Sequence, residues 1–191
     1  MVAVEVDRGM FEQLKLIGPT ERSIVVQTRK GTDIKNLVEI EPGFPERQRY
    51  QLLLRTHGEH WVERKPASGV YNCAGHVWAS RRTAILEVDQ WELVLQEDNY
   101  RRLPDHEPPV PGDLVLYVDT ESDEPLHVGE ILGLRPGLGS GSRGIPWVLS
   151  KWNSTSGEVM HHLNQVPYLA LGFRVRTEFW TDRSPRAELQ P

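Results

Sequence analysis

Residues 111–133 read PGDLVLYVDTESDEPLHVGEILG, and this stretch decides the fold. It contains two runs, 113–118 and 126–133, that carry the β-branched, aliphatic and aromatic residues typical of strands. The residues between them, 119–125, are acidic and end in a proline, which is typical of a loop. Because strands joined by a short loop usually pair antiparallel, the stretch predicts an antiparallel pair of strands.

Strand and helix patterns continue on both sides of this pair. Residues 146–152 and 170–177 have the composition of strands, whereas residues 73–86 and 90–100 place apolar side chains at helical spacing. Helices followed by antiparallel strands are the order of the α+β class, in which the helices pack against one sheet. The sequence therefore predicts an α+β fold.

The chain divides into three expected parts. Residues 1–65 form an N-terminal extension or accessory β-rich segment, with strand-like runs at 23–28 and 36–40. Residues 66–180 form the main domain. Residues 181–191 have no apolar period and two prolines, so we expect a flexible tail.

The composition excludes several classes of function. A net charge of −5 gives no electrostatic reason to expect a nucleic-acid partner. One cysteine cannot form an internal disulfide, and the chain has no CxxC pair, so we expect neither a structural metal nor a cofactor. No apolar run reaches the ~18 residues of a membrane span, and residues 1–8 carry charges where a signal peptide is apolar. We therefore expect a soluble protein that does not bind membranes and is cytoplasmic as synthesised.

The single cysteine, Cys73, lies in the segment YNCAGHVW at residues 71–78, at the expected start of a helix. Backbone N–H groups at a helix start are unpaired and carry partial positive charge, which favours a thiolate and a developing oxyanion. Cys73 is therefore a candidate nucleophile. Such a nucleophile needs an imidazole base, and His127 at the start of the strand 126–133 is the candidate.

A third polar group should orient the imidazole, and Ser150 and Asn153 on the next strand are the candidates. Alternation along a regular strand puts them on opposite faces, so only one of them could reach His127. An amide oxygen readily accepts an imidazole N–H, which favours Asn153, whereas Ser150 is better placed in the middle of the strand. The neighbours His161 and His162 also point to opposite faces of a strand, which argues against a shared metal site.

Three segments together resemble the NlpC/P60 papain-like cysteine peptidases. Residues 72–77, NCAGHV, are similar to the family's Asp-Cys-Ser-Gly-aromatic-Val nucleophile motif, and residues 111–114, PGDL, are similar to its Pro-Gly-Asp-Leu strand. Residues 127–133, HVGEILG, are similar to the segment His-Val-Gly-Ile-x-x-Gly that carries the family's histidine. The related CHAP amidases fit as well, because they share the order of cysteine and histidine and can use an acidic or amide third residue. The resemblance covers residues 70–155.

This resemblance implies a papain-like NlpC/P60-type core, in which N-terminal helices present the cysteine on an antiparallel sheet. It implies a bacterial cysteine hydrolase, a peptidase or amidase, that cleaves an amide bond in a peptide or peptidoglycan fragment through a Cys73 thioester with His127 as base. Tyr71 and Asn72 would lie near the oxyanion or substrate, and Trp152 would line the cleft. Asn72 stands where the family has Asp, and the third strand has no histidine counterpart, so the substrate stays open. A cell-wall substrate would require export by a non-classical route.

Two other functions stay open at this point. The same thiol chemistry would serve a deamidase, acyltransferase or isopeptidase that acts on a cytoplasmic target. Alternatively, the protein is a non-catalytic binding module of the same fold, in which the Cys73 thiol keeps an ordinary pKa of about 8.5. The sequence does not identify a protein partner or inhibitor.

Overall fold

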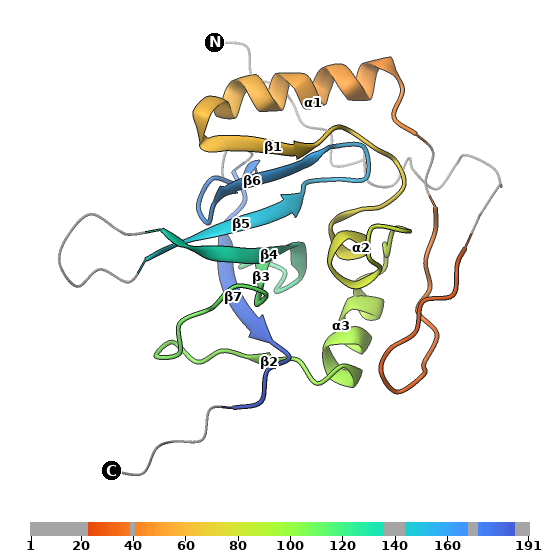
Figure 1. Ribbon diagram of the computed structural model, residues 1–191, viewed down its shortest axis with the longest axis vertical. Helices are drawn as coiled ribbons and strands as arrows, with labels where there is room; N and C mark the ends of the chain where they lie inside the picture. Colours follow the sequence, from red (N-terminus) through yellow and green to blue (C-terminus); the bar gives the residue numbers. More distant parts are fainter. Residues whose placement is uncertain (1–22, 39–40, 136–143, 168–171, 186–191) are drawn as a thin grey trace.

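The computed structural model describes residues 23–38, 41–135, 144–167 and 172–185. In this part of the chain a seven-stranded sheet has the order β1-β6-β5-β4-β3-β7-β2, and its neighbouring strands pair antiparallel. The strands are β1 (Trp61–Lys65), β2 (Arg101–Arg102), β3 (Leu114–Asp119), β4 (Pro125–Arg135), β5 (Ile145–Lys151), β6 (Glu158–His162) and β7 (Val175–Thr181). The helices are α1 (Phe44–His57), α2 (Cys73–Trp78) and α3 (Val88–Glu97), with a 3₁₀ turn, η3 (Gly58–His60), after α1. The predicted α+β class is confirmed, and Figure 1 shows α2 and α3 stacked beside the sheet with α1 alongside β1.

β3 and β4 are the antiparallel pair that residues 111–133 predict. Leu116 lies opposite Val128, and Tyr117 lies opposite His127. Before β3, the Asp113 carboxylate accepts the backbone N–H of Val110 at 2.7 Å. This contact closes the turn that delivers the chain into the sheet.

α2 is shorter than the helix predicted over residues 73–86. It ends at Trp78 because Ser80 and Arg81 adopt the left-handed backbone conformation, with φ of 50° and 65°. The chain then folds back over the helix so closely that a Cβ on Gly75 would lie 1.7 Å from the Thr83 carbonyl oxygen. The glycine of the segment 71–78 is therefore needed for this close approach.

The N-terminal part of the chain differs from the predicted β-rich segment. Instead of strands at 23–28 and 36–38, the chain there forms isolated bridges, Gln27 with Asp33 and Leu37 with Ala84, and residues 39–40 of the second predicted strand lie outside the described residues. Residues 44–65 belong to the same folded unit as the rest, because β1 pairs with β6 and Tyr50 of α1 is buried in the same apolar cluster as Val115. The predicted boundary at residue 65 therefore falls at the end of β1, an edge strand of the sheet, and does not separate two folded units.

The C-terminal end is also tied to the sheet. The strand expected at 170–177 is β7, which occupies Val175–Thr181, and residues 170–171 lie outside the described residues. Beyond it, the Arg183 guanidinium donates to both Asp113 carboxylate oxygens, at 3.0 and 2.7 Å. The described beginning of the predicted tail is thus held by the turn before β3.

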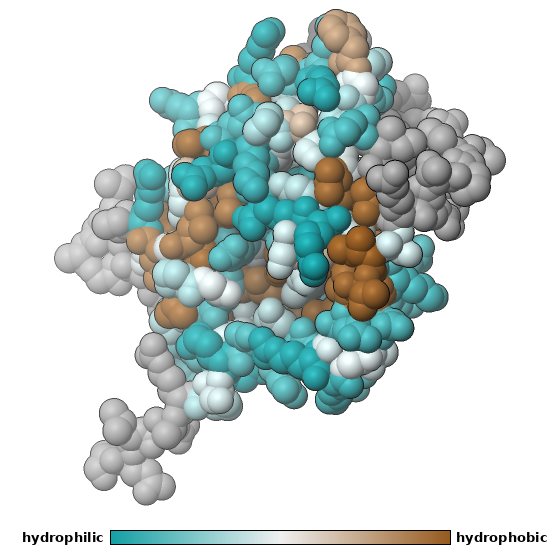
Figure 2. Space-filling model, turned by 45° about the vertical axis from the view of Figure 1, so that its right-hand side comes forward, coloured by the Kyte–Doolittle hydropathy of each residue, from teal (hydrophilic) through white to brown (hydrophobic). Residues whose placement is uncertain are grey.

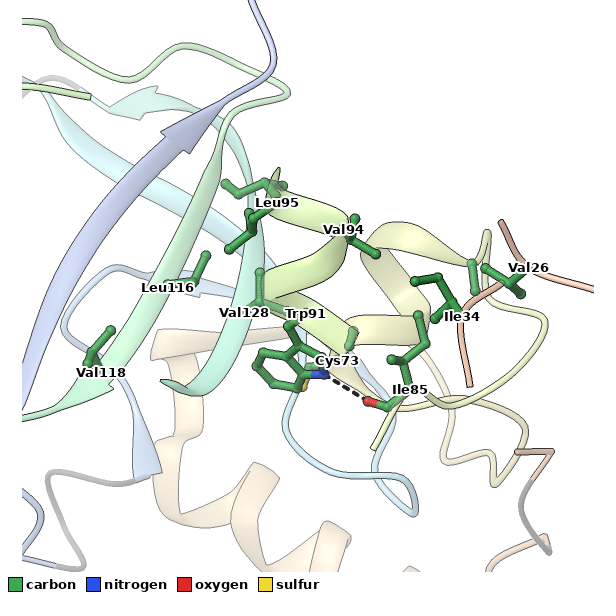
Figure 3. Packing of buried hydrophobic residues seen from close by; sticks show 13 residues of the cluster. Val26, Ile34, Cys73, Ile85, Trp91, Val94, Leu95, Leu116, Val118 and Val128 are labelled. Atoms are coloured by element: carbon green, nitrogen blue, oxygen red, sulfur yellow. Dashed lines mark hydrogen bonds between the residues drawn. The ribbon is translucent and has the colours of Figure 1, made fainter. Parts of the chain in front are cut away.

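Two apolar clusters pack on the sheet. The α2 cluster gathers side chains from α2, α3 and the sheet, among them Cys73, Trp91, Leu116 and Val128 (Figure 3). The aromatic cluster contains, among others, Tyr50, Trp61, Tyr117, Trp152 and Val159. Successive side chains of a strand point to opposite faces, which is why Leu116 and Tyr117 belong to different clusters. Hydrophilic side chains cover most of the face in Figure 2, with hydrophobic ones gathered in smaller areas.

Candidate active site

Asn72 sets the start of the helix that carries Cys73. Its side-chain oxygen accepts the backbone N–H groups of Gly75 at 2.9 Å and Ile85 at 3.0 Å, and its amide nitrogen donates to the Ile85 carbonyl at 2.8 Å. The first bond is an N-cap, and the other two bind the helix start to the returning chain. The Asn72 amide therefore has a structural role in place of the expected contact with an oxyanion or substrate.

The Cys73 thiol is buried, with 6% of the residue exposed. Burial raises the pKa of the thiol to about 11, although the backbone N–H groups of Val128, Ala74 and Cys73 and the positive charge of Lys151 act in the opposite direction. The sequence predicts a lowered value from the helix start. A helix of six residues adds too little to overcome the loss of water around the sulfur.

The structure brings this thiol to β4. The N–H of Val128 that favours the thiolate belongs to the residue directly after His127. Figure 3 shows Cys73 in the α2 cluster with Trp91 and Ile85, and the Trp91 indole N–H donates to the Ile85 carbonyl at 2.9 Å. The nucleophile predicted from the sequence thus lies against the peptide unit that follows the predicted base.

The His127 ring is fully buried and packs among aromatic side chains. It stacks on Trp152, with ring centroids 4.1 Å apart and planes 17° apart, and lies 5.7 Å from the Tyr117 ring. Burial, followed by the charges of His161 and His76, lowers the pKa of His127 well below its ordinary value. At neutral pH the imidazole is therefore uncharged, and it binds a proton less readily than an ordinary histidine does.

Trp152 belongs to a row of stacked rings. Besides His127, it stacks on Trp61 at 5.7 Å, and Trp61 stacks on His57 of α1 at 4.0 Å. With 6% of the residue exposed, Trp152 orients His127 in this structure. The Trp152 ring therefore packs among buried rings and does not line a cleft, which is where we expected it.

The two candidates for a third residue have other partners. The Ser150 hydroxyl lies 2.7 Å from Nε2 of His161, whose Nδ1 lies 2.9 Å from the His162 carbonyl oxygen. Since a carbonyl only accepts, Nδ1 of His161 donates to it and Nε2 accepts the Ser150 hydroxyl. The Asn153 side-chain oxygen accepts from the Thr155 backbone N–H at 2.9 Å and from the Ser156 hydroxyl at 2.8 Å, within its own turn.

His161 is a site residue whose importance the sequence does not reveal. It lies 4.9 Å from the Trp152 ring, and its charge is among the causes that lower the pKa of His127. Burial lowers the pKa of His161 itself to about 4. His162 packs instead on Trp147, so the two histidines face apart as strand alternation predicts.

A buried carboxylate, Glu158, lies beneath the segment that carries Cys73. It accepts hydrogen bonds from the Tyr71 hydroxyl at 2.5 Å and Arg81 Nε at 2.6 Å, and its oxygen is 3.3 Å from Nδ1 of His76. Burial would raise the pKa of Glu158, but the hydrogen bonds from His76, Tyr71 and Arg81 outweigh it and the pKa is lowered. The Tyr71 hydroxyl therefore serves Glu158 and not the expected oxyanion pocket. No motif marks Glu158 in the sequence, because only the pairing of β6 with β5 places it there.

A cavity of about 280 Å³ lies elsewhere, between the proline-rich loop at 104–109 and strands β4, β5 and β7. Neither Cys73 nor His127 lines it. Among residues 23–38, 41–135, 144–167 and 172–185, no three His, Cys, Asp or Glu side chains are grouped to hold a metal ion. In the same residues, no helix combines the length and the apolar character needed to cross a membrane.

Comparison of the chain with protein-family models, with curated proteins and with solved structures finds no match.

Proposed function

We propose that the protein is a cysteine hydrolase that cleaves an amide bond with Cys73 as nucleophile and His127 as general base. The observation that carries this proposal is the position of the thiol, at the first residue of α2 and against the β4 peptide that follows His127. The α+β architecture and the three segments similar to NlpC/P60 peptidases, at residues 72–77, 111–114 and 127–133, support it. The finer assignment to a papain-like core is part of the proposal.

The pKa values of the two groups indicate how they would work. The thiol pKa is raised and the imidazole pKa is lowered, so both groups are uncharged in the resting protein at neutral pH. His127 would take the proton from Cys73 as the sulfur attacks the carbonyl carbon, and would then give it to the departing amine. Water activated by His127 would hydrolyse the thioester and release the acid and the free thiol. The reaction resembles general-base catalysis and does not begin from a thiolate–imidazolium pair.

The peptide N–H groups around the sulfur would stabilise the negative charge that develops. Those of Val128, Ala74 and Cys73 already favour a thiolate at this position. The side chains of Tyr71 and Asn72 have partners in the fold, so we assign charge stabilisation to the backbone.

An acylation experiment tests the proposal without a known substrate. The wild-type protein is treated with p-nitrophenyl acetate, an activated ester, and nitrophenol release and the mass of the protein are followed together. We expect an acetyl group on Cys73 that disappears with time, and loss of both signals in Cys73→Ala. Equal nitrophenol release from Cys73→Ala, with no acetyl group on Cys73 in the wild type, would contradict the proposal. Peptides and peptidoglycan stem peptides are the amide substrates to try next.

A second candidate function, a non-catalytic binding module, is favoured by one observation. Cys73 is 6% exposed and His127 is 0% exposed, as expected of core residues in a module that performs no chemistry. If the module is non-catalytic, Cys73 in the folded protein resists acylation and becomes reactive only when urea unfolds the chain. A deamidase, an acyltransferase or an isopeptidase would instead form an acyl group on Cys73. These enzymes would differ in the acceptor, water or an added amine, that removes the acyl group.

A further inference from the structure

Lys151 is the last residue of β5, and its side chain is fully buried. Lysine is rarely buried completely, because its ammonium group loses the solvation of water. Here the fold replaces that solvation with backbone oxygens. Nζ of Lys151 donates to the carbonyl oxygens of Ser68 at 2.7 Å, Ser156 at 2.5 Å and Ser154 at 3.1 Å. Three acceptors match the three N–H bonds of an ammonium group.

These acceptors come from two loops, one of which leads to the candidate nucleophile. Ser68 lies in the loop that leads into α2, and Ser154 and Ser156 lie in the turn between β5 and β6. Nζ of Lys151 also lies 4.9 Å from the centre of the Tyr71 ring, two residues before Cys73. One buried cation therefore ties the segment before Cys73 to the β5–β6 turn.

The surrounding charges allow the positive charge of Lys151 to act on the thiol. Glu158, opposite Lys151 in the β5–β6 pairing, already accepts hydrogen bonds from Tyr71 and Arg81 and contacts His76. The positive charge of Lys151 is among the influences that oppose the burial of the Cys73 thiol. At low local dielectric such a charge acts more strongly than it would at the surface.

We propose that Lys151 is a positioning residue for Cys73, because its buried ammonium joins the loop that leads into α2 to the β5–β6 turn and stabilises the Cys73 thiolate. This inference rests on the proposed role of Cys73 as a nucleophile. It concerns the ionisation of the thiol, whereas the proposed function concerns the reaction that follows, so the two can fail separately.

The test uses a His127→Ala background, in which the imidazole cannot assist and the alkylation rate follows the thiolate fraction. The rate of Cys73 alkylation by iodoacetamide is measured at one pH between 8 and 9 for the His127→Ala parent and for the same protein with Lys151→Met or Lys151→Arg. Circular dichroism checks that each protein is folded. We expect Lys151→Met to react about tenfold more slowly, the effect of one pKa unit on the thiolate fraction. Lys151→Arg keeps the charge and should stay within about threefold of the parent.

Lys65→Met is the matched control. Nζ of Lys65 lies 3.9 Å from Glu158, but half of this side chain is exposed, so solvent screens its charge and the alkylation rate should not change. A folded Lys151→Met protein that reacts at the parental rate would overturn the inference. Should Lys151→Met fail to fold, a tenfold loss in a folded Lys151→Arg protein would overturn it equally, because the charge is still present there.

Discussion

The surroundings of Cys73 and those of His127 differ in charge, although His127 belongs to β4 and the Cys73 thiol lies against the same strand. Near Cys73 the fold buries two ions: Glu158, which accepts a hydrogen bond from the partly exposed Arg81, and Lys151, which donates to three carbonyl oxygens. Around His127 it buries rings, with Trp152 stacked at 4.1 Å and Tyr117 nearby. The charged side favours an anion at sulfur, and the aromatic side disfavours a cation on the imidazole.

This difference explains why the resting site does not hold an ion pair. A buried thiolate–imidazolium pair would need the imidazole to be charged where burial and the charges of His161 and His76 lower its pKa. An uncharged His127 is instead a base at every pH above its lowered pKa. Substitutions among the aromatic residues around His127 should therefore remove the base. Substitutions among the ions near Cys73 should instead change the stability of the fold and the ionisation of the thiol.

The largest effect is expected from His127→Ala. Loss of a general base typically lowers a rate by about 10²–10⁴-fold, so acetylation of Cys73 by p-nitrophenyl acetate should fall by that factor at pH 7. His162→Ala is the control, because this histidine packs on Trp147 and has no role in the proposed reaction. Equal acylation rates in both variants and in the wild type would remove His127 from the mechanism.

Removal of the ring that stacks on His127 should reduce stability and activity together. Trp152→Ala leaves a large cavity in the aromatic cluster, which costs about 3–5 kcal/mol of unfolding free energy. Urea unfolding measures this cost, and the acylation rate of the folded fraction should fall as well, because the imidazole loses its orientation. Trp147→Ala, on β5, the strand that ends directly before Trp152, is the matched control for an effect on stability without one on acylation. Acylation that survives in Trp152→Ala and is lost in Trp147→Ala would reverse the assignment.

Neutralising the buried carboxylate should destabilise the charged side in a pH-dependent way. Glu158→Gln removes the anion that Arg81 faces, and we expect a loss of about 2–4 kcal/mol at pH 7. The folded-state pKa of Glu158 lies below the unfolded value of about 4.3, so its contribution is complete above that value and is lost as the pH falls. The difference between wild type and variant in urea unfolding should therefore hold at pH 7 and shrink as the pH falls from about 5 to 3. A difference that stays constant over this range would show that the charge of Glu158 is not what stabilises the fold.

The smallest effect is expected at Asn153. Asn153→Ala removes three hydrogen bonds of the β5–β6 turn and should cost about 1 kcal/mol in unfolding free energy. The Cys73 acylation rate should stay at the wild-type value. A loss of acylation comparable to that of His127→Ala would instead restore Asn153 as the residue that orients the imidazole.

The strands of the central sheet could be predicted from the sequence because their signals are local. Runs of β-branched, aliphatic and aromatic residues and the acidic loop predict β3, β4 and β5 close to their observed limits. The early end of α2 could not be predicted, because it depends on left-handed backbone at Ser80 and Arg81 and on the chain folding back over Gly75. The bridges near residues 27 and 37 replace strands for the same reason: their partners are set by tertiary contacts.

The residues of the candidate site also divide into those with a local sequence signal and those whose role depends on tertiary contacts. Cys73 and His127 could be proposed from short motifs, and the structure places the thiol against the peptide after His127. The sequence could not indicate a role for Glu158, Lys151 or His161, because each of them becomes relevant only when β5 and β6 pair. The raised thiol pKa also depends on burial, which a single segment of sequence does not reveal.

The pH dependence of Cys73 acylation by p-nitrophenyl acetate tests the central claim most directly. If an uncharged His127 takes the proton from a protonated thiol, the wild-type rate should be flat between pH 6 and 9, because neither group changes its protonation state in that range. In His127→Ala the rate should rise about tenfold per pH unit, in step with the thiolate fraction. A wild-type rate that rises with this slope and is unchanged by His127→Ala would contradict the claim that Cys73 and His127 form one catalytic site.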